Sequence, residues 1–216
     1  MSRISITTIA FLATLSLLIA LPSQARPRKG FHSGPYLALE VGISQEDFDR
    51  DQVTGQNVGR DWESAFGFIF GWNIWDSFSA ELQGRYTTNL NKGRRAHLAN
   101  ANFYGKYTFI SNTLTDFERF RILPFVKGGL AVKVEALPGT PGATHNTAIR
   151  TALGPAIGGG LSFLWNKYLY FGIDAQEEFL FFGSIHQTVG ATPDLLVYRG
   201  GFHPSFCAMG MIGVHY

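Results

Sequence analysis

The chain has one cysteine, Cys207, in 216 residues, which excludes an internal disulfide and a metal site built from clustered cysteines. Charged residues are also scarce, at 16% of the sequence, and a formal net charge of +2 gives no indication of nucleic-acid binding. Hydrophobic residues nevertheless make up 45% of the chain, which excludes a disordered protein. The 25 glycines and 19 phenylalanines favour β structure, and the length suits one domain.

Long uninterrupted apolar sequence is confined to the N-terminus. Arg3 precedes an apolar stretch from Ile4 to Leu21, and Ser23-Gln24-Ala25 offers small residues where a signal peptidase cuts. We therefore expect residues 1–25 to be a secretory signal peptide and residues 26–216 to form the mature domain. An uncleaved membrane anchor is the alternative. Since the mature chain has no apolar run of helix-spanning length, it can be membrane-integral only as a β-barrel.

Apolar and polar residues alternate through most of the mature chain. Between residues 63 and 74, Phe66, Phe68 and Phe70 fall on one side of an extended chain, and small residues fall on the other. A period of two predicts β-strands. The pattern predicts eight of them, near residues 36–45, 63–74, 77–89, 97–110, 122–135, 148–163, 168–181 and 198–216. Glu177 breaks the pattern by falling on an apolar side, which places it at the edge of the apolar region or beside a β-bulge.

The predicted connections differ in length. Long polar connections fall near residues 46–61, 90–96, 136–146 and 183–195, whereas residues 75–76 and 166–167 form short turns. Residues 111–121 have apolar side chains at near-helical spacing, so a short helical turn is expected there. Long loops at one end and short turns at the other are typical of outer-membrane barrels.

The polar side of the predicted strands has nearly equal numbers of acidic and basic residues. A soluble barrel would turn this side to water, whereas a membrane barrel would turn it inward, and alternation alone does not distinguish the two. Aromatic residues near the strand ends, such as Trp62, Trp72 and Trp165, favour the membrane. We therefore predict that the lumen is closed by charged side chains that pair with one another, with Glu135 on the same side as Glu40, Glu81, Arg85, Lys106, Lys127, Lys133, Arg150, Asp174, Glu178 and Arg199.

Five segments carry a resemblance to a known family. They are the signal peptide together with GPYLALEVG at 34–42, AFGFIFGW at 65–72, FSAEL at 78–82 and the C-terminal GMIGVHY. The chain resembles the small eight-stranded outer-membrane β-barrels of Gram-negative bacteria, the OmpA/OmpX type. This resemblance implies an all-β, antiparallel, up-and-down transmembrane barrel with both termini periplasmic. It also implies that Ile212, Val214 and Tyr216 form the signal read by the barrel-insertion machinery, although the family usually ends in Phe.

For function, these features favour a monomeric outer-membrane protein with a structural or surface-interaction role. Its partners would be outer-membrane lipid and a host or envelope ligand at the extracellular loops; no nucleic acid, metal or cofactor is expected. A narrow ion or small-solute channel is the first alternative. A lipid A-modifying enzyme is the next, with His203 as base and Ser205 as nucleophile beside Glu178 or Asp174. A soluble lipocalin-like carrier is the last. We predict no catalytic residues.

Overall fold

The computed structural model describes residues 34–46, 61–75, 77–91, 94–110, 121–138, 147–165, 168–189 and 192–215. The predicted signal peptide, Tyr216 and most of the predicted helical turn at 111–121 lie outside this part of the chain. The strands of the described part are β1 (Gly34–Glu46), β2 (Asp61–Trp75), β3 (Phe78–Asn91), β4 (Arg94–Thr108), β5 (Arg121–Pro138), β6 (Thr147–Leu164), β7 (Leu169–Phe182), β8 (Ile185–Val189), β9 (Thr192–Tyr198) and β10 (Gly201–His215).

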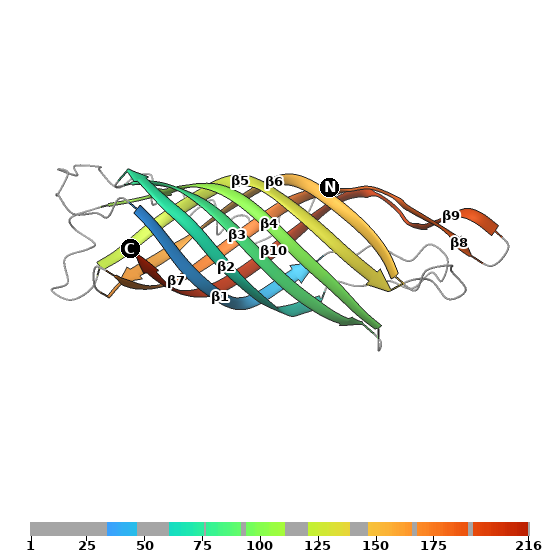
Figure 1. The fold of residues 1–216 in the computed structure, drawn as a ribbon, viewed down its shortest axis with the longest axis horizontal. Coiled ribbons are helices and arrows are strands. Elements are labelled where there is room, and N and C mark those ends of the chain that lie inside the picture. The colour runs from blue at the N-terminus through green and yellow to red at the C-terminus, as the bar shows by residue number, and fades with distance from the viewer. Residues whose placement is uncertain are drawn as a thin grey trace, which may run out of the picture.

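Eight strands close into an antiparallel barrel in the order β1-β10-β7-β6-β5-β4-β3-β2 (Figure 1). The first and last strands pair directly, with Tyr36 opposite His215. This confirms the predicted fold. No helix in the described residues is long and apolar enough to cross a membrane.

The strands are strongly staggered around the barrel. Following the paired residues once around from Gly34 returns to β1 at Ser44, ten residues further along. Such a stagger requires the strands to tilt against the barrel axis, as Figure 1 shows. It also brings inward-facing residues that are distant in sequence to one row, which runs through Gly34, Asn73, Ser79, Lys106, Lys127, Gly158, Gln176, Cys207 and Ser44.

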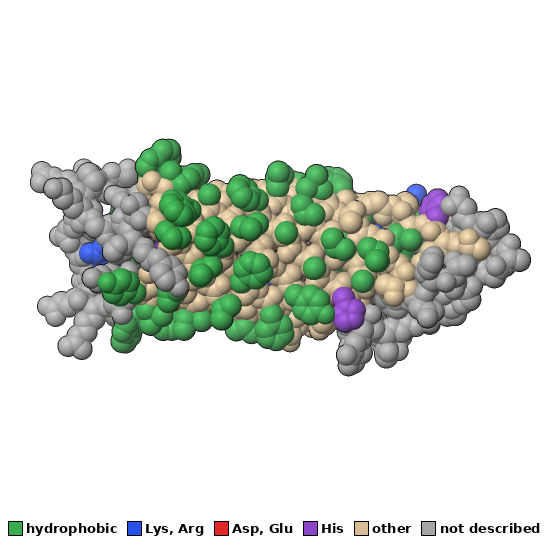
Figure 2. Space-filling model, in the orientation of Figure 1, with side chains coloured by type: hydrophobic (Ala, Val, Ile, Leu, Met, Phe, Trp, Pro, Cys, Tyr) green, Lys and Arg blue, Asp and Glu red, His purple; other side chains and the backbone are tan. Residues whose placement is uncertain are grey.

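The two sides of the barrel wall have opposite character. Phe66 on the outer face is 58% exposed, whereas Glu81 and Lys133 on the inner face are each 1% exposed. Figure 2 shows hydrophobic side chains spread over the outer wall. The apolar side of the alternating pattern therefore faces outward and the charged side faces inward, as predicted for a membrane barrel. A soluble barrel requires the reverse arrangement.

Strands β8 and β9 form a separate two-stranded sheet. It projects beyond the barrel at the end opposite to the start of β1 and the end of β10 (Figure 1). The sequence prediction is wrong here in two ways: the segment 183–195 is not a loop, and Tyr198 ends β9 and does not belong to the last barrel strand. The segment 90–96 is also not a long loop, because β3 and β4 remain paired as far as Asn91 and Arg94.

The register of β7 resolves the position of Glu177. Its pairing with β10 runs without a shift from Leu169 to Phe182, so no bulge lies at Glu177. Neighbouring residues of β7 alternate between the two faces, and Glu177 falls on the outer one, opposite Phe206.

Close approach of β4 and β5 requires a glycine at position 129. A Cβ added at Gly129 would lie 1.8 Å from the backbone oxygen of Phe103, whereas one at the adjacent Gly128 would meet nothing nearer than 4.0 Å. We expect Gly129→Ala to lower the free energy of unfolding by about 1–3 kcal/mol, because the clashing atoms belong to the backbone. Gly128→Ala is the matched control and should leave it nearly unchanged. Urea unfolding in lipid vesicles measures both, and equal effects would contradict the close approach.

Candidate functional site in the charged interior

The structure places the predicted lumen residues inside the barrel, with one exception. Arg199 is exposed in the connection between β9 and β10, so its assignment to the lumen was wrong. The strand ends before this residue, and the inward parity read from the sequence no longer applies to it. The others are buried on the inner face: Glu40, Glu81, Arg85, Lys106, Lys127, Lys133, Arg150, Asp174 and Glu178.

Glu178 on β7 accepts four hydrogen bonds inside the barrel. Its Oε1 accepts hydrogen bonds from Arg85 Nη2 at 2.7 Å, Asn102 Nδ2 at 2.8 Å and Gln176 Nε2 at 3.2 Å. Its Oε2 accepts from Asn100 Nδ2 at 2.7 Å. The donors come from β3, β4 and β7, so this carboxylate ties together strands on opposite sides of the barrel.

A second group surrounds Glu81 on β3. Its Oε1 accepts a hydrogen bond from the Tyr36 hydroxyl at 2.5 Å and forms an ion pair with Lys106 Nζ at 2.8 Å. The Lys106 ammonium also lies 4.4 Å from the ring centroid of Phe125, which is within cation–π range. Tyr36 and Phe125 belong to an apolar cluster with Tyr170 and Met211. The lumen at this level is therefore filled by aromatic rings and one buried ion pair.

A third group joins β5 to β7 through Lys127. Its ammonium forms an ion pair with Asp174 and lies 4.4 Å from the ring centroid of Tyr104. It also interacts electrostatically with Glu40 and Glu81. Glu40 Oε2 accepts a hydrogen bond from Gln83 Nε2 at 2.7 Å.

The last group lies towards the loop end. Arg150 Nε on β6 forms an ion pair with Glu135 Oε2 on β5 at 2.6 Å, and Lys133 Nζ is 3.9 Å from the other oxygen. The Arg150 guanidinium lies 4.2 Å from the ring centroid of Phe182 and 6.0 Å from that of Tyr198. Because Tyr198 ends β9, the base of the projecting hairpin contributes to the barrel interior.

These four groups, called the lumen network below, obey one physical rule. A buried charge without a partner is strongly unfavourable, whereas a paired and hydrogen-bonded charge is tolerated. The sequence prediction found the charged members and missed the neutral ones that complete them. Their inward parity was the available signal, and it is shared by Tyr36, Gln83, Asn100, Asn102 and Gln176.

The geometry for nucleophilic catalysis at Ser205 is incomplete. Ser205 is buried opposite Glu178, but its Oγ makes no hydrogen bond within the described part of the chain. It therefore makes none with His203, whose ring packs against Phe182 at 5.4 Å. The Glu178 carboxylate is already engaged by the lumen network. A serine nucleophile requires a base that is hydrogen-bonded to its hydroxyl group. Among the described residues, no base is hydrogen-bonded to the Ser205 hydroxyl.

The predicted assembly residues lie on the strand that closes the barrel. Ile212 is opposite Leu39 and Val214 opposite Leu37 on β1, and Ile212 is 48% exposed on the outer face. Both therefore belong to the apolar outer wall. Their recognition by insertion machinery stays a prediction, and Tyr216 lies beyond the described residues.

No protein-family model matches the chain, and no curated protein is similar to it in sequence. Solved structures do share its fold. Neisserial surface protein A (NspA) superposes with a TM-score of 0.59 at 11% identity, over 85% of this chain and 98% of that one. The outer membrane protein OprG from Pseudomonas aeruginosa superposes with a TM-score of 0.53 at 12% identity, over 85% and 96%. The chain therefore has the fold of the small eight-stranded outer-membrane β-barrels.

Two adjacent glutamates provide a test of the lumen network. We expect Glu178→Ala to lower the free energy of unfolding by about 3–5 kcal/mol, because the buried Arg85 guanidinium would lose its ion pair with this carboxylate. Glu177→Ala, one residue away on the outer face, is the matched control and leaves the network intact. The measurement is urea unfolding in lipid vesicles, followed by tryptophan fluorescence. Equal stability of the two variants would contradict a stabilising role for Glu178.

Proposed function

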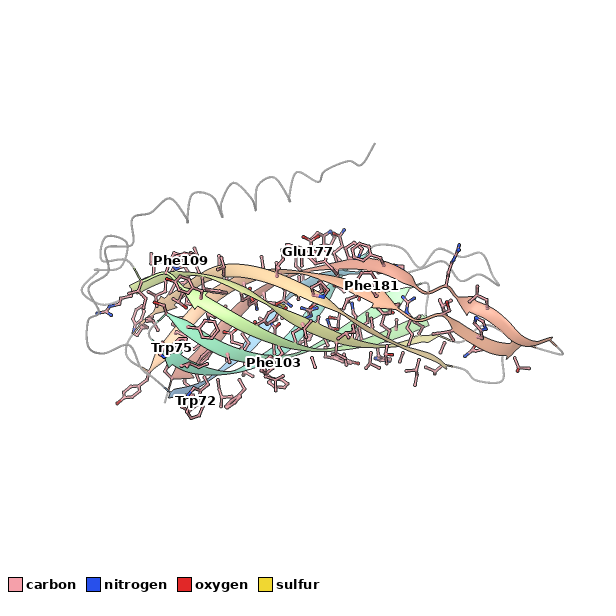
Figure 3. All side chains as sticks on the ribbon, turned by 90° about the horizontal axis from the view of Figure 1, so that it is seen from above. Trp72, Trp75, Phe103, Phe109, Glu177 and Phe181 are labelled. Carbon is pink, nitrogen blue, oxygen red and sulfur yellow. The ribbon has the colours of Figure 1, made fainter. Side chains whose placement is uncertain are left out.

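We propose that this chain is an integral outer-membrane protein whose barrel spans the bilayer and whose loop end makes contacts outside the cell. The observation that carries the proposal is the inverted wall, with phenylalanines exposed on the outside and ion pairs buried within. An exposed apolar surface that surrounds a closed barrel is unfavourable in water and favourable in lipid. The aromatic residues Trp72, Trp75 and Phe109 gather at one end of the wall (Figure 3), where amphipathic rings suit a lipid–water boundary.

A structural or surface-contact role is better supported than transport. Eight strands leave an interior only wide enough for side chains to fill. The acids and bases in it are joined at 2.6–2.8 Å in the pairs of Arg85, Lys106 and Arg150. Acids and bases joined in this way are held by each other and are less available to a passing ion. We therefore assign the lumen network to stability, and the narrow channel stays the second candidate.

The projecting β8–β9 hairpin is the part of the loop end best placed for such contacts. It begins directly after β7 and is anchored to the barrel by a hydrogen bond from Gln187 Nε2 to the Thr147 backbone oxygen at 3.4 Å. Its anchoring and its reach beyond the barrel suit a rigid contact element, whether the ligand belongs to a host or to the envelope.

Labelling of intact cells tests both the location and the orientation. We expect a cysteine at His186, exposed on β8, to react with a membrane-impermeant maleimide on intact cells. A cysteine at Ser77, in the turn between β2 and β3 at the opposite end, should react only after the outer membrane is permeabilised. The single native cysteine, Cys207, is buried and should stay unlabelled. The reverse pattern would contradict the orientation, and a soluble periplasmic product would contradict the membrane location.

Conductance separates the structural role from the channel. We expect the purified protein to give no stepwise current in a planar bilayer, because the lumen network occupies the interior. The current is compared with that of the Glu178→Ala variant, prepared at the same protein-to-detergent ratio. This variant lacks the carboxylate that accepts four hydrogen bonds in the lumen network. Steady unitary currents from the native protein would establish the channel instead.

A further inference from the structure

The acids and bases buried in the barrel are not equal in number. Among the described residues, the buried acids are Glu40, Glu63, Glu81, Glu135, Asp174 and Glu178, whereas the buried bases are Arg85, Lys106, Lys127, Lys133 and Arg150. Four of these acids form ion pairs with the bases, namely Glu81, Glu135, Asp174 and Glu178. Of the other two, Glu63 lies towards the loop end of the barrel, opposite Ser44 near the end of β1. Glu40 is therefore the buried acid in the middle of the lumen that forms no ion pair with a described residue.

The carboxyl group of Glu40 is only half satisfied. It is 4% exposed and is located at the midpoint of β1. Its Oε2 accepts a hydrogen bond from Gln83 Nε2 at 2.7 Å, whereas its Oε1 has no hydrogen-bond partner in the described part of the chain. An amide donor is neutral and does not balance a charge. An ionised Glu40 would therefore be a buried charge without a base of its own, which is strongly unfavourable.

The charged groups around Glu40 increase this penalty. Lys127 of β5 acts on Glu40 electrostatically, but its ammonium is already paired with Asp174 of β7. Asp174 and Glu81 are themselves acids that act on Glu40. Two further titratable groups interact with it and are uncharged at neutral pH, Tyr170 of β7 and Cys207 of β10. With Lys106 on Glu81, this middle group of the lumen has three acids and two bases.

A proton can remove the excess negative charge with the residues in this arrangement. A metal ion requires several ligand atoms that converge on one point. The described residues contain no group of three or more acidic, histidine or cysteine side chains placed to hold such an ion. The Lys127 ammonium also occupies the position beside Asp174 that a cation would take. A buried carboxyl group keeps its proton when ionisation would leave an unmatched charge.

We propose that Glu40 binds one proton in the folded barrel and is a neutral carboxylic acid at neutral pH. Oε2 continues to accept the hydrogen bond from Gln83, and the proton is bound to Oε1, the oxygen without a donor. Asp174 Oδ1, in the same group, is an acceptor without a donor among the described residues, so the new O–H has a candidate partner. The two bases of the group are then matched by two ionised acids. This inference concerns the closed lumen and is independent of what the loops contact.

Replacement by glutamine tests the site, because glutamine has nearly the shape of a protonated glutamate and has no charge. We expect Glu40→Gln to leave the unfolding equilibrium constant at neutral pH nearly unchanged. Glu178→Gln is the matched control, since it makes the same change at a buried acid that is paired with Arg85. It should raise the unfolding equilibrium constant about a hundredfold or more through loss of the ion pair. Urea unfolding of the full chain in lipid vesicles measures both variants.

Infrared spectroscopy detects the proton directly. A neutral carboxylic acid has a C=O stretching band that an ionised carboxylate lacks. The spectrum of the native protein at neutral pH minus that of Glu40→Gln should contain one such band. The spectrum of the native protein minus that of Glu178→Gln should contain none, because Glu178 is ionised in its pair with Arg85. Absence of the band from the Glu40 difference spectrum would overturn the proposal.

The dependence of stability on pH gives a second readout. Unfolding is followed from about pH 6 to about pH 9, within the range in which buried carboxyl groups titrate. Once Glu40 ionises, an unmatched charge is buried, so the unfolding equilibrium constant of the native protein should rise about tenfold per pH unit relative to that of Glu40→Gln. Parallel pH profiles would contradict the proton site.

Replacement of sodium by a bulky organic cation separates a proton from a bound metal ion. We expect no change in the stability of the native protein or of Glu40→Gln. Destabilisation of the native protein alone would overturn the proposal, because an ion would then hold Glu40 in its ionised form. None of these outcomes affects the membrane location, which cysteine labelling of intact cells tests separately.

Discussion

This barrel depends on one constraint. Because its strands close around the lumen, the charged side chains inside must neutralise one another. Eight strands with a ten-residue stagger enclose a space that side chains fill. Each charged group in that space must be matched by another, because water cannot compensate for a missing partner. Glu178 illustrates the solution, since one carboxylate satisfies four donors from three strands. The polar interior then joins the strands from within, while the outer phenylalanines need only an apolar solvent.

Strict alternation explains why so much of the wall was predictable. In a strand, side-chain direction depends only on whether a position is odd or even, so Glu81 and Lys106 could be assigned to the interior without knowledge of any partner. The same rule failed at Arg199, because parity was carried from β10 back across a break in the strand. It also missed the β8–β9 sheet. These two strands are short, and their pairing shifts register at two places, so their residues do not alternate regularly between apolar and polar.

The pairing of individual acids and bases could not be predicted from the sequence, for a different reason. Arg85 and Glu178 are 93 positions apart, and they meet only because the stagger of the barrel brings β3 and β7 side chains to one level. The sequence shows that acids and bases on the inner face are nearly equal in number. Which acid pairs with which base depends on how the strands close into the barrel. The neutral donors were overlooked because amides carry no charge to be balanced. In the structure, Asn100 and Asn102 nevertheless supply the hydrogen bonds that a single arginine cannot.

Glu177 and Glu178 show how the register of one strand is fixed. They are adjacent, chemically identical and on opposite faces of β7. A slip of one residue would exchange them, and would also turn Phe181 inward and Leu180 and Asp174 outward. Asp174 would then lose its ion pair with Lys127, and Arg85 would lose its ion pair with Glu178. Leaving one glutamate on the outer face is the smaller penalty. The observed register therefore follows from the interior, and the outer face must accommodate the acid that remains.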